Sequence, residues 1–428
     1  MDEFVRLANM PLNGGAAPGG AAKGDPRRWL MLAIGLLAQA ASCAFIYGLP
    51  FVLPALRHDE HLSLAQGGLL VATPTLGVVA TLVGWGAFVD RWGERLAMSI
   101  GLGASGLLLL AAYAVHGVVG MGILFGLAGA AGASVNASSG RVVMGWFPAE
   151  QRGVAMGARQ MAQPLGVAIA ALALPPLAAA FGVRVALLAP AALALVVAAI
   201  AGWLVVDPPR KARAAGEAKP ANPYRTPALW RIHASSALLV IPQFAVTVFS
   251  EEYLVSVRHW GSGSAGRLLA LVQMAGAVGR LVTGQWSDRA GSRLGPMRQI
   301  AVASALAMIA VGLTARTGSW VVLLALAAAT VISVADNGLG FTATAELAGQ
   351  AWSGRALGMQ NTAQNIVAFL TPPLFATLVG GVGYGWAFVA CAVFPAIGVL
   401  TTPVAAEQPL RSTEQPRGKT AGAAERSA

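Results

Sequence analysis

The chain has 428 residues, of which 56% are hydrophobic and 11% charged, and its mean hydropathy is +0.65. Soluble domains usually carry about 25% charged residues, so this composition excludes an ordinary soluble protein and predicts a chain embedded in a lipid bilayer. The formal net charge of +11 does not indicate a nucleic-acid partner, because the basic residues are spread over short loops and tails and no recognition module is visible.

In chain order, twelve apolar runs are predicted to be membrane-spanning helices, because each has about the twenty residues needed to cross the hydrocarbon core. The runs cover residues 29–55, 66–89, 95–116, 118–144, 153–180, 184–206, 228–255, 264–287, 296–316, 319–344, 355–380 and 383–405. The predicted fold class is therefore an all-α membrane protein with twelve transmembrane helices.

The segments between and beyond these runs divide the chain into two halves. Residues 1–28 and 406–428 contain no long apolar run and are expected to be disordered tails. The stretch 207–227 is rich in proline and basic residues, which is typical of a linker. Residues 29–206 and 228–405 are each predicted to form a six-helix bundle.

Lysine and arginine are distributed unequally between the two sides of this topology. With the N-terminus inside, 21 of the 29 basic residues lie on the cytoplasmic side and 5 on the other. Cytoplasmic loops carry an excess of basic residues in membrane proteins. We therefore expect an inner-membrane protein with both termini in the cytoplasm.

One motif occurs twice, 198 residues apart, and each copy follows the second apolar run of its half. The copies are Gly86-Ala87-Phe88-Val89-Asp90-Arg91-Trp92-Gly93 and Gly284-Gln285-Trp286-Ser287-Asp288-Arg289-Ala290-Gly291. A second repeat, at an offset of 201, aligns Asn136 with Asn337 and Gly153 with Gly354. Two repeats at equivalent points of equal halves predict a duplicated membrane protein.

The doubled motif resembles the cytoplasmic loop signature of the major facilitator superfamily, and the resemblance covers roughly residues 29–405. It implies two pseudo-symmetric six-helix bundles that work by alternating access. In that family the Asp caps a helix terminus across the interface between the halves, so the resemblance implies a gating role here; the alternative is that these residues only fix topology. The residues concerned are Gly86, Asp90, Arg91, Gly93, Gly284, Asp288, Arg289 and Gly291.

Arg280 is the most telling charge within an apolar run, because it lies eight residues before Asp288 and so about 12 Å into the bilayer. The sequence Gly279-Arg280-x-x-x-Gly284 resembles helix 8 of oxalate/formate antiporters and monocarboxylate transporters, in which the matching Arg contacts the substrate carboxylate. A guanidinium suits a carboxylate because two parallel hydrogen bonds form at once. The alternatives are a structural ion pair with Asp336 and a role in gating.

Other polar residues within the runs are candidates for substrate binding or coupling. Arg159 either reaches the cytoplasmic interface or joins Arg280 across the interface between the halves, and Arg141 is expected to anchor the end of its helix at the interface. Asp336 is a candidate proton carrier or a paired structural acid, and Glu251 is a candidate for proton access or a solvated acid. Because helices 1, 4, 7 and 10 surround the cavity in the family, further cavity candidates are Gln39, Tyr47, Asn136, Gln243 and Asn337.

The predicted eleventh helix carries an amide stripe on one face, which either binds a neighbouring helix or lines the transport path; of its members Gln364 is the one expected to touch substrate. The stripe consists of Gln360, Asn361, Gln364 and Asn365.

Taken together, the sequence predicts a secondary transporter, or symporter, for a small organic anion, driven by protons or by exchange with a counter-anion. We expect a monomer. No phosphate-binding loop, His/Cys metal cluster or nucleophile constellation is visible, so no cofactor, metal or enzymatic activity is expected. The alternatives are an efflux pump for drug-like compounds and a membrane sensor built on a transporter fold.

Overall fold

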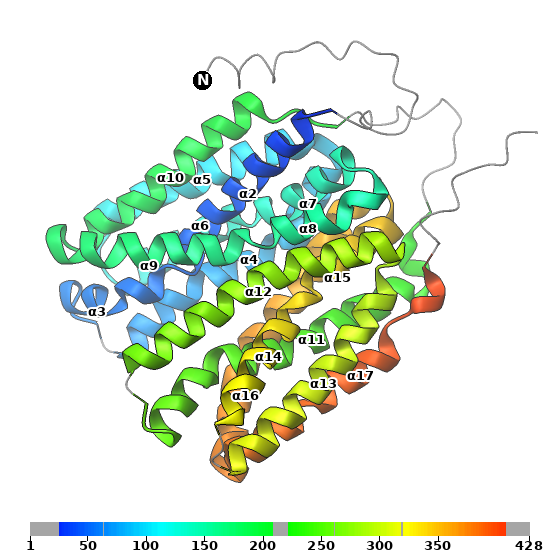
Figure 1. The fold of residues 1–428 in the computed structure, drawn as a ribbon. Coiled ribbons are helices and arrows are strands. Elements are labelled where there is room, and N and C mark those ends of the chain that lie inside the picture. Colours follow the sequence, from blue (N-terminus) through cyan, green and yellow to red (C-terminus); the bar gives the residue numbers. More distant parts are fainter. Residues whose placement is uncertain (1–24, 63, 209–220, 261, 318–319, 408–428) are drawn as a thin grey trace, which may run out of the picture.

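The computed structural model describes residues 25–62, 64–208, 221–260, 262–317 and 320–407, and every regular element in these residues is helical (Figure 1). Eleven helical stretches are long and apolar enough to cross a membrane. The last of them, Ser353–Ala406, has 54 residues and would be about 80 Å long if straight, more than twice the hydrocarbon thickness. It is interrupted at Gly383, whose φ of +76° is not helical, so it supplies two spans and gives the twelve predicted.

The first half contains six spans, three of which are built from two helices each. In order the elements are α2 (Arg27–Ile46) with α3 (Leu49–Asp59), α4 (Leu64–Trp92), α5 (Glu94–Ala114), α6 (Val118–Gly132) with α7 (Ser134–Trp146), η1 (Ala149–Gln151) and α8 (Arg152–Arg159) with α9 (Ala162–Phe181), and α10 (Val183–Leu204).

The second half repeats this arrangement. Its elements are η2 (Pro223–Arg225), α11 (Pro227–Glu252) with η3 (Tyr253–Val257), α12 (Ser262–Ala290), α13 (Leu294–Thr317), α14 (Val321–Ala335) with α15 (Asn337–Ala348), α16 (Ser353–Cys391), α17 (Val393–Thr401) and η4 (Val404–Ala406).

Both copies of the repeated motif lie on the side of the bundle from which the linker leaves, which we call the linker side. On this side Gly93 and Gly291 end their turns with φ of +103° and +63°, a conformation that favours glycine because it has no Cβ. Each half is also followed by a carboxylate that accepts backbone N–H groups at the start of the third span of that half. Asp207 accepts the backbone N–H groups of Glu94 and Arg95 at the start of α5 (2.9 and 2.8 Å), and Glu407 accepts that of Leu294 at the start of α13.

The two halves meet along two equivalent seams on the linker side. In the first seam, α4 packs on the start of α16; in the second seam, α12 packs on α8 (Figure 1). Gly86 faces Gly354 in the first seam and Gly284 faces Gly153 in the second, so closely that a Cβ on any of them would collide with the backbone opposite. Small residues at these points permit the close approach of the helices.

The distribution of the apolar core follows the same division. One buried cluster on the linker side joins Met156 and Val142 of the first half to Phe341 and Leu357 of the second. Toward the opposite side each half keeps a core of its own, one drawn from residues 44–191 and the other from residues 245–392. The two halves therefore share one apolar core on the linker side, whereas each half has its own core on the opposite side.

Candidate functional site

Asp90 caps a helix of the other half across the first seam. Its carboxylate accepts the backbone N–H groups of Gly354 and Arg355 at 2.8 and 3.0 Å, at the start of α16. It also forms ion pairs with Arg141 of α7 (2.6 Å) and with the side chain of Arg355 (3.0 Å). Arg141 is buried and bonded to Glu94 as well, so the expectation that it anchors the membrane interface was wrong.

Asp288 does the same across the second seam. It accepts the N–H groups of Gly153 and Val154, both at 2.9 Å, at the start of α8. A carboxylate is favourable there because the helix N-terminus carries partial positive charge. Arg293 pairs with Asp288 of its own half at 2.5 Å and donates to the carbonyl of Ala149 in the other half, so it crosses the second seam once directly and supports the Asp288 cap.

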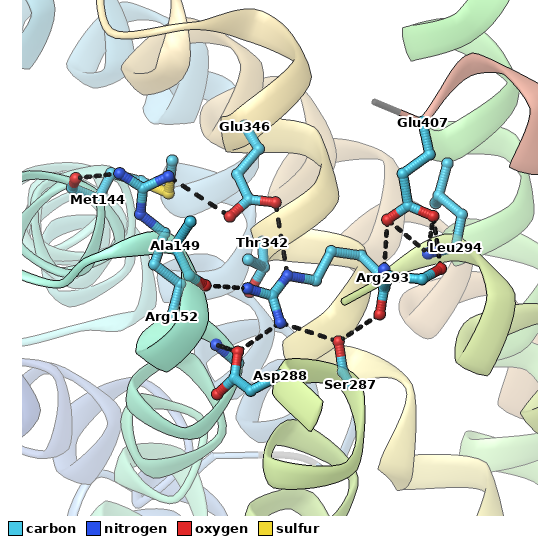
Figure 2. A network of polar contacts seen from close by, with 12 residues as sticks. Met144, Ala149, Arg152, Ser287, Asp288, Arg293, Leu294, Thr342, Glu346 and Glu407 are labelled. Atoms are coloured by element: carbon cyan, nitrogen blue, oxygen red, sulfur yellow. Dashed lines mark hydrogen bonds and ion pairs between the residues drawn. The ribbon is translucent and has the colours of Figure 1, made fainter. Parts of the chain in front are cut away.

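Arg293 is the centre of a charge network that the sequence did not reveal (Figure 2). It is fully buried, and besides Asp288 its guanidinium approaches Glu346 at 3.4 Å, while its backbone N–H donates to Glu407. Glu346 in turn lies 3.4 Å from Arg152 of the first half. In the sequence, Arg293 is one of the basic residues that indicate the cytoplasmic side. The repeat offset of 198 does not point to a network either, because the counterpart, Arg95, plays no similar role: it is exposed and donates to a carbonyl of its own half.

A cavity of about 80 Å³ lies between the halves. Viewed from the linker side, it lies deeper than both seams. Small-molecule sites usually measure about 300–1,000 Å³, so this cavity is too narrow for most substrates in the present conformation. Tyr47 and Asn365, from different halves, lie 3.4 Å apart across it. It is lined by Gln39, Cys43, Ile46, Tyr47, Val78, Asn136, Gln160, Gln163, Val240, Gln243, Phe244, Asn337, Phe341, Asn361, Gln364, Asn365 and Ala368.

Nine of these seventeen lining residues are amides, and no charged residue is among them. Each half has one amide pair in the lining, and the repeat relates the asparagines of the two pairs. Gln39 Nε2 donates to Asn136 Oδ1 at 3.3 Å in the first half, and Asn337 Nδ2 donates to Gln243 Oε1 at 3.1 Å in the second. The discontinuities α6–α7 and α14–α15 place Asn136 and Asn337 in the first turn after a helix break, where polar groups commonly line transporter sites.

Six of the eight predicted substrate-binding or cavity residues line this cavity, and the two arginines lie just outside it. The six are Gln39, Tyr47, Asn136, Gln243, Asn337 and Gln364. The sequence did not single out Gln160 or Gln163. An available signal was the offset of 201, which relates Gln163 to Gln364 and Gln160 to Asn361, both in the amide stripe.

Arg159 is a buried cation without a carboxylate partner among the described residues. Its guanidinium donates to Ser139 Oγ (2.8 Å), to the Gln160 side chain (2.7 Å) and to the backbone carbonyl of Asn136 (2.7 Å). It also lies 5.3 Å from the ring centre of Phe341, which belongs to the other half. The charge of Arg159 is thus stabilised by neutral groups alone among the described residues, and its side chain does not reach the cytoplasmic membrane interface.

Arg280 approaches the same point from the other half. Its Nη1 donates to the backbone carbonyl of Gln160 at 2.5 Å, across the second seam, whereas its Nε has no hydrogen-bond partner in the described residues. No ion pair within 4.0 Å joins Arg280 to Asp336, although the two attract each other electrostatically. The ion pair named among the alternatives for Arg280 is therefore not formed in this conformation.

Asp336 occupies the break between α14 and α15 and is 1% exposed. Its Oδ2 accepts no hydrogen bond from the described residues. Thr283 Oγ1 bonds both the carbonyl of Arg280 and that of Ala335 (3.2 and 2.9 Å), which holds the two charge-bearing segments together. The side chain of Glu251, the other predicted coupling residue, lies outside the part of the chain that the structure describes.

The two buried arginines break the symmetry of the fold. At the equivalent positions of the first seam, Leu82 corresponds to Arg280 (offset 198) and Gln360 corresponds to Arg159 (offset 201). The glycine contacts confirm the match, since Gly157 packs on the backbone of Arg280 as Gly358 packs on that of Leu82. At these two equivalent positions the second seam therefore carries buried cations, whereas the first seam carries the uncharged Leu82 and Gln360.

Comparison with known proteins agrees with this architecture. The profile of the Major Facilitator Superfamily matches residues 35–372. An uncharacterized MFS-type transporter of Mycobacterium tuberculosis, Rv2994, is 42% identical over 379 residues, which are 88% of this chain and 85% of the relative.

Similar solved structures include the Escherichia coli fucose:proton symporter FucP (14% identity, 89% of this chain and 99% of that one, TM-score 0.70) and the human organic anion transporter MFSD10 (14% identity, 88% and 100%, TM-score 0.72). At this identity they show the fold alone. The family match and the 42% identical relative establish more: this chain is a transporter, not an enzyme, and it belongs to the Major Facilitator Superfamily.

Proposed function

We propose that this transporter moves a small organic anion, in particular a carboxylate, across the inner membrane by alternating access. The observation that carries the proposal is the pair of buried guanidiniums, Arg159 and Arg280, on the second seam. The fold does not require them, because the equivalent first seam is built with Leu82 and Gln360.

The electrostatics favour an anion. Burying a cation without a counter-ion is costly, and Arg159 has only neutral partners among the described residues. A carboxylate brought into the adjoining cavity would compensate the charge. The amides of the lining can each donate two hydrogen bonds to its oxygens. A drug-like compound would instead favour a predominantly apolar, aromatic lining, whereas amides make up nine of the seventeen lining residues here.

Movement of the halves would change what Arg280 contacts. Its bond to the Gln160 carbonyl crosses the second seam, so separating the halves on the linker side must break that bond. The guanidinium would then face the space between the halves with its donors free. This supports the proposal that Arg280 binds substrate in the state open to the linker side, as the resemblance to carboxylate transporters implies.

Orientation and coupling complete the proposal. The positive-inside rule assigns the linker side to the cytoplasm, with both termini inside, so the present conformation is closed to the cytoplasm. Asp336 is a buried carboxylate near Arg280 and has no ion pair among the described residues, which suits a proton carrier whose protonation competes with substrate for the same cation. Exchange with a counter-anion is the other mode of coupling, and the protein is proposed to act as a monomer.

The proposal is tested by uptake into proteoliposomes that contain the purified protein. Labelled mono- and dicarboxylates of two to six carbons are compared with the neutral amide of each acid, which has the same shape without the charge. We expect saturable uptake of at least one acid and none of its amide. Arg267→Gln, which removes an exposed arginine of α12, is the charge control and should transport normally. Uptake of amides or amines without uptake of any acid would contradict the proposal.

A further inference from the structure

A second hollow, separate from the central cavity, lies on the linker side of the second half and measures about 620 Å³. It is bounded by the first turns of α11 and α13 and by the end of α17 with η4. Its walls carry two arginines, Arg231 of α11 and Arg298 of α13, together with apolar residues that include Leu400 and Val404. We call it the α11–α13 groove.

The two arginines lie at the same depth. Each is four residues after the first residue of its helix, Pro227 for α11 and Leu294 for α13, which is about 6 Å along the axis. Both are exposed. Arg231 donates to the carbonyls of Thr401 and Leu400 at 3.1 and 3.0 Å, which fixes its position, and Arg298 has no hydrogen bond or ion pair with the described residues.

Large apolar side chains are exposed beside the two arginines. Leu400, on the groove wall, is 76% exposed, and Trp230, next to Arg231, is 51% exposed. Tryptophan is enriched at the level of lipid headgroups. The repeat offset of 198 relates Arg298 to Ile100 of α5, which is also exposed. An apolar side chain therefore suffices at this depth in the first half, and the fold itself does not require arginine there.

We propose that the α11–α13 groove binds the headgroup of an anionic phospholipid. Two guanidiniums can hold a phosphate through paired hydrogen bonds, and basic pockets between helices at this level are suited to acidic headgroups. The exposed leucine beside them would contact the acyl chain. The segments next to the groove in sequence are net basic, which disfavours them as its anion: residues 209–220 carry four basic and one acidic residue, and residues 408–428 carry four and two.

The test is native mass spectrometry of the full-length protein in detergent, titrated with phosphatidylglycerol, cardiolipin and phosphatidylcholine that share the same acyl chains. We expect the two acidic lipids to bind more tightly than phosphatidylcholine. Arg298→Gln should weaken their binding about fivefold, and the double variant with Arg231→Gln about 25-fold. Arg267→Gln, which removes an exposed arginine at the far end of α12, should leave it unchanged.

Several outcomes would overturn the inference. These are equal binding of phosphatidylcholine, unchanged affinity in Arg298→Gln, and displacement of phosphatidylglycerol by an equal concentration of inorganic phosphate, which would show a site for soluble anions. If the double variant does not yield a monodisperse protein, Arg298→Gln decides the matter, because Arg298 makes no bond in the described residues that folding could require.

Discussion

Arg280 in the second half donates from Nη1 to the backbone carbonyl of Gln160 in the first half, at 2.5 Å. Gln160 also holds Arg159 through its side chain (2.7 Å), so one residue of the cavity wall is flanked by two buried cations from different halves. The same bond closes the second seam. The proposed substrate recognition by Arg280 and the closure of the linker side would thus be connected through Gln160.

Replacement of Arg280 tests its role in binding. Arg280→Lys keeps the charge but loses the planar fork, so the affinity for the transported anion should fall about tenfold. Arg280→Ala should abolish anion transport, because the cavity then loses a fixed cation. Substrate affinity and flux are measured in proteoliposomes. Leu82→Ala, at the equivalent position of the first seam, is the control and should keep its anion affinity.

Arg159→Gln tests whether the second cation is needed. The substitution gives the first half the residue that the second half has at Gln360, so the fold should accept it. We expect binding of the anion to weaken at least tenfold, because an uncompensated positive charge next to the cavity is lost. Isothermal titration with the transported acid measures the effect. An unchanged Kd would assign Arg159 a purely structural role.

Asp336→Asn tests coupling. If Asp336 carries the proton, the variant should still exchange internal for external substrate but should no longer accumulate substrate when a pH gradient is applied. Counterflow and gradient-driven uptake are compared in the same vesicles. Gradient-driven accumulation at the parental rate would exclude Asp336 as the carrier and would leave anion exchange as the mode of coupling.

Asp90→Asn and Asp288→Asn test the two caps. An amide oxygen can still accept one N–H, but the charge that pairs with Arg141 or Arg293 is gone, so the closed linker side should be destabilised. Flux should fall about tenfold with substrate affinity changed less than twofold. Asp59→Asn is the matched control, since Asp59 caps α10 within one half by accepting the N–H of Val183 at 3.0 Å. Unchanged flux in both variants would return Asp90 and Asp288 to a topological role.

Asp59 itself supports a prediction for the dependence of stability on pH. The hydrogen bond from the N–H of Val183, and then the contact with His58, lower the pKa of the Asp59 carboxyl below its usual value. A carboxyl whose pKa is lowered on folding contributes stability above its unfolded pKa and loses it as the pH falls through the folded one. Asp59→Ala should therefore lower Tm by roughly 2 °C at pH 6, and by less at an acidic pH below the usual range of an Asp carboxyl. Equal differences at both pH values would show that the charge is not involved.

The sequence by itself determined the class of fold, because apolar runs of bilayer length leave few alternatives to a helical bundle. The doubled motif placed Asp90 and Asp288 at equivalent points, and the offset of 201 paired Asn136 with Asn337. Such repeats can be read from one chain because duplication preserves spacing. The amides at Gln243 and Gln364 were also found, since polar side chains inside apolar runs are conspicuous.

Only the tertiary structure decided which charges meet. In the sequence, Arg293 resembles any other loop arginine. In the structure, the close packing of Gly153 against Gly284 accompanies its placement between Asp288 and Glu346. The contacts that cross the seams join residues more than a hundred positions apart, such as Asp288 with Gly153 and Asp90 with Gly354. Successive residues are rotated by about 100° around a helix, so a shift of one position decides whether a side chain faces lipid, a seam or the cavity. Sequence spacing constrains depth along a helix well, but it leaves the choice of partner to the packing of the two halves.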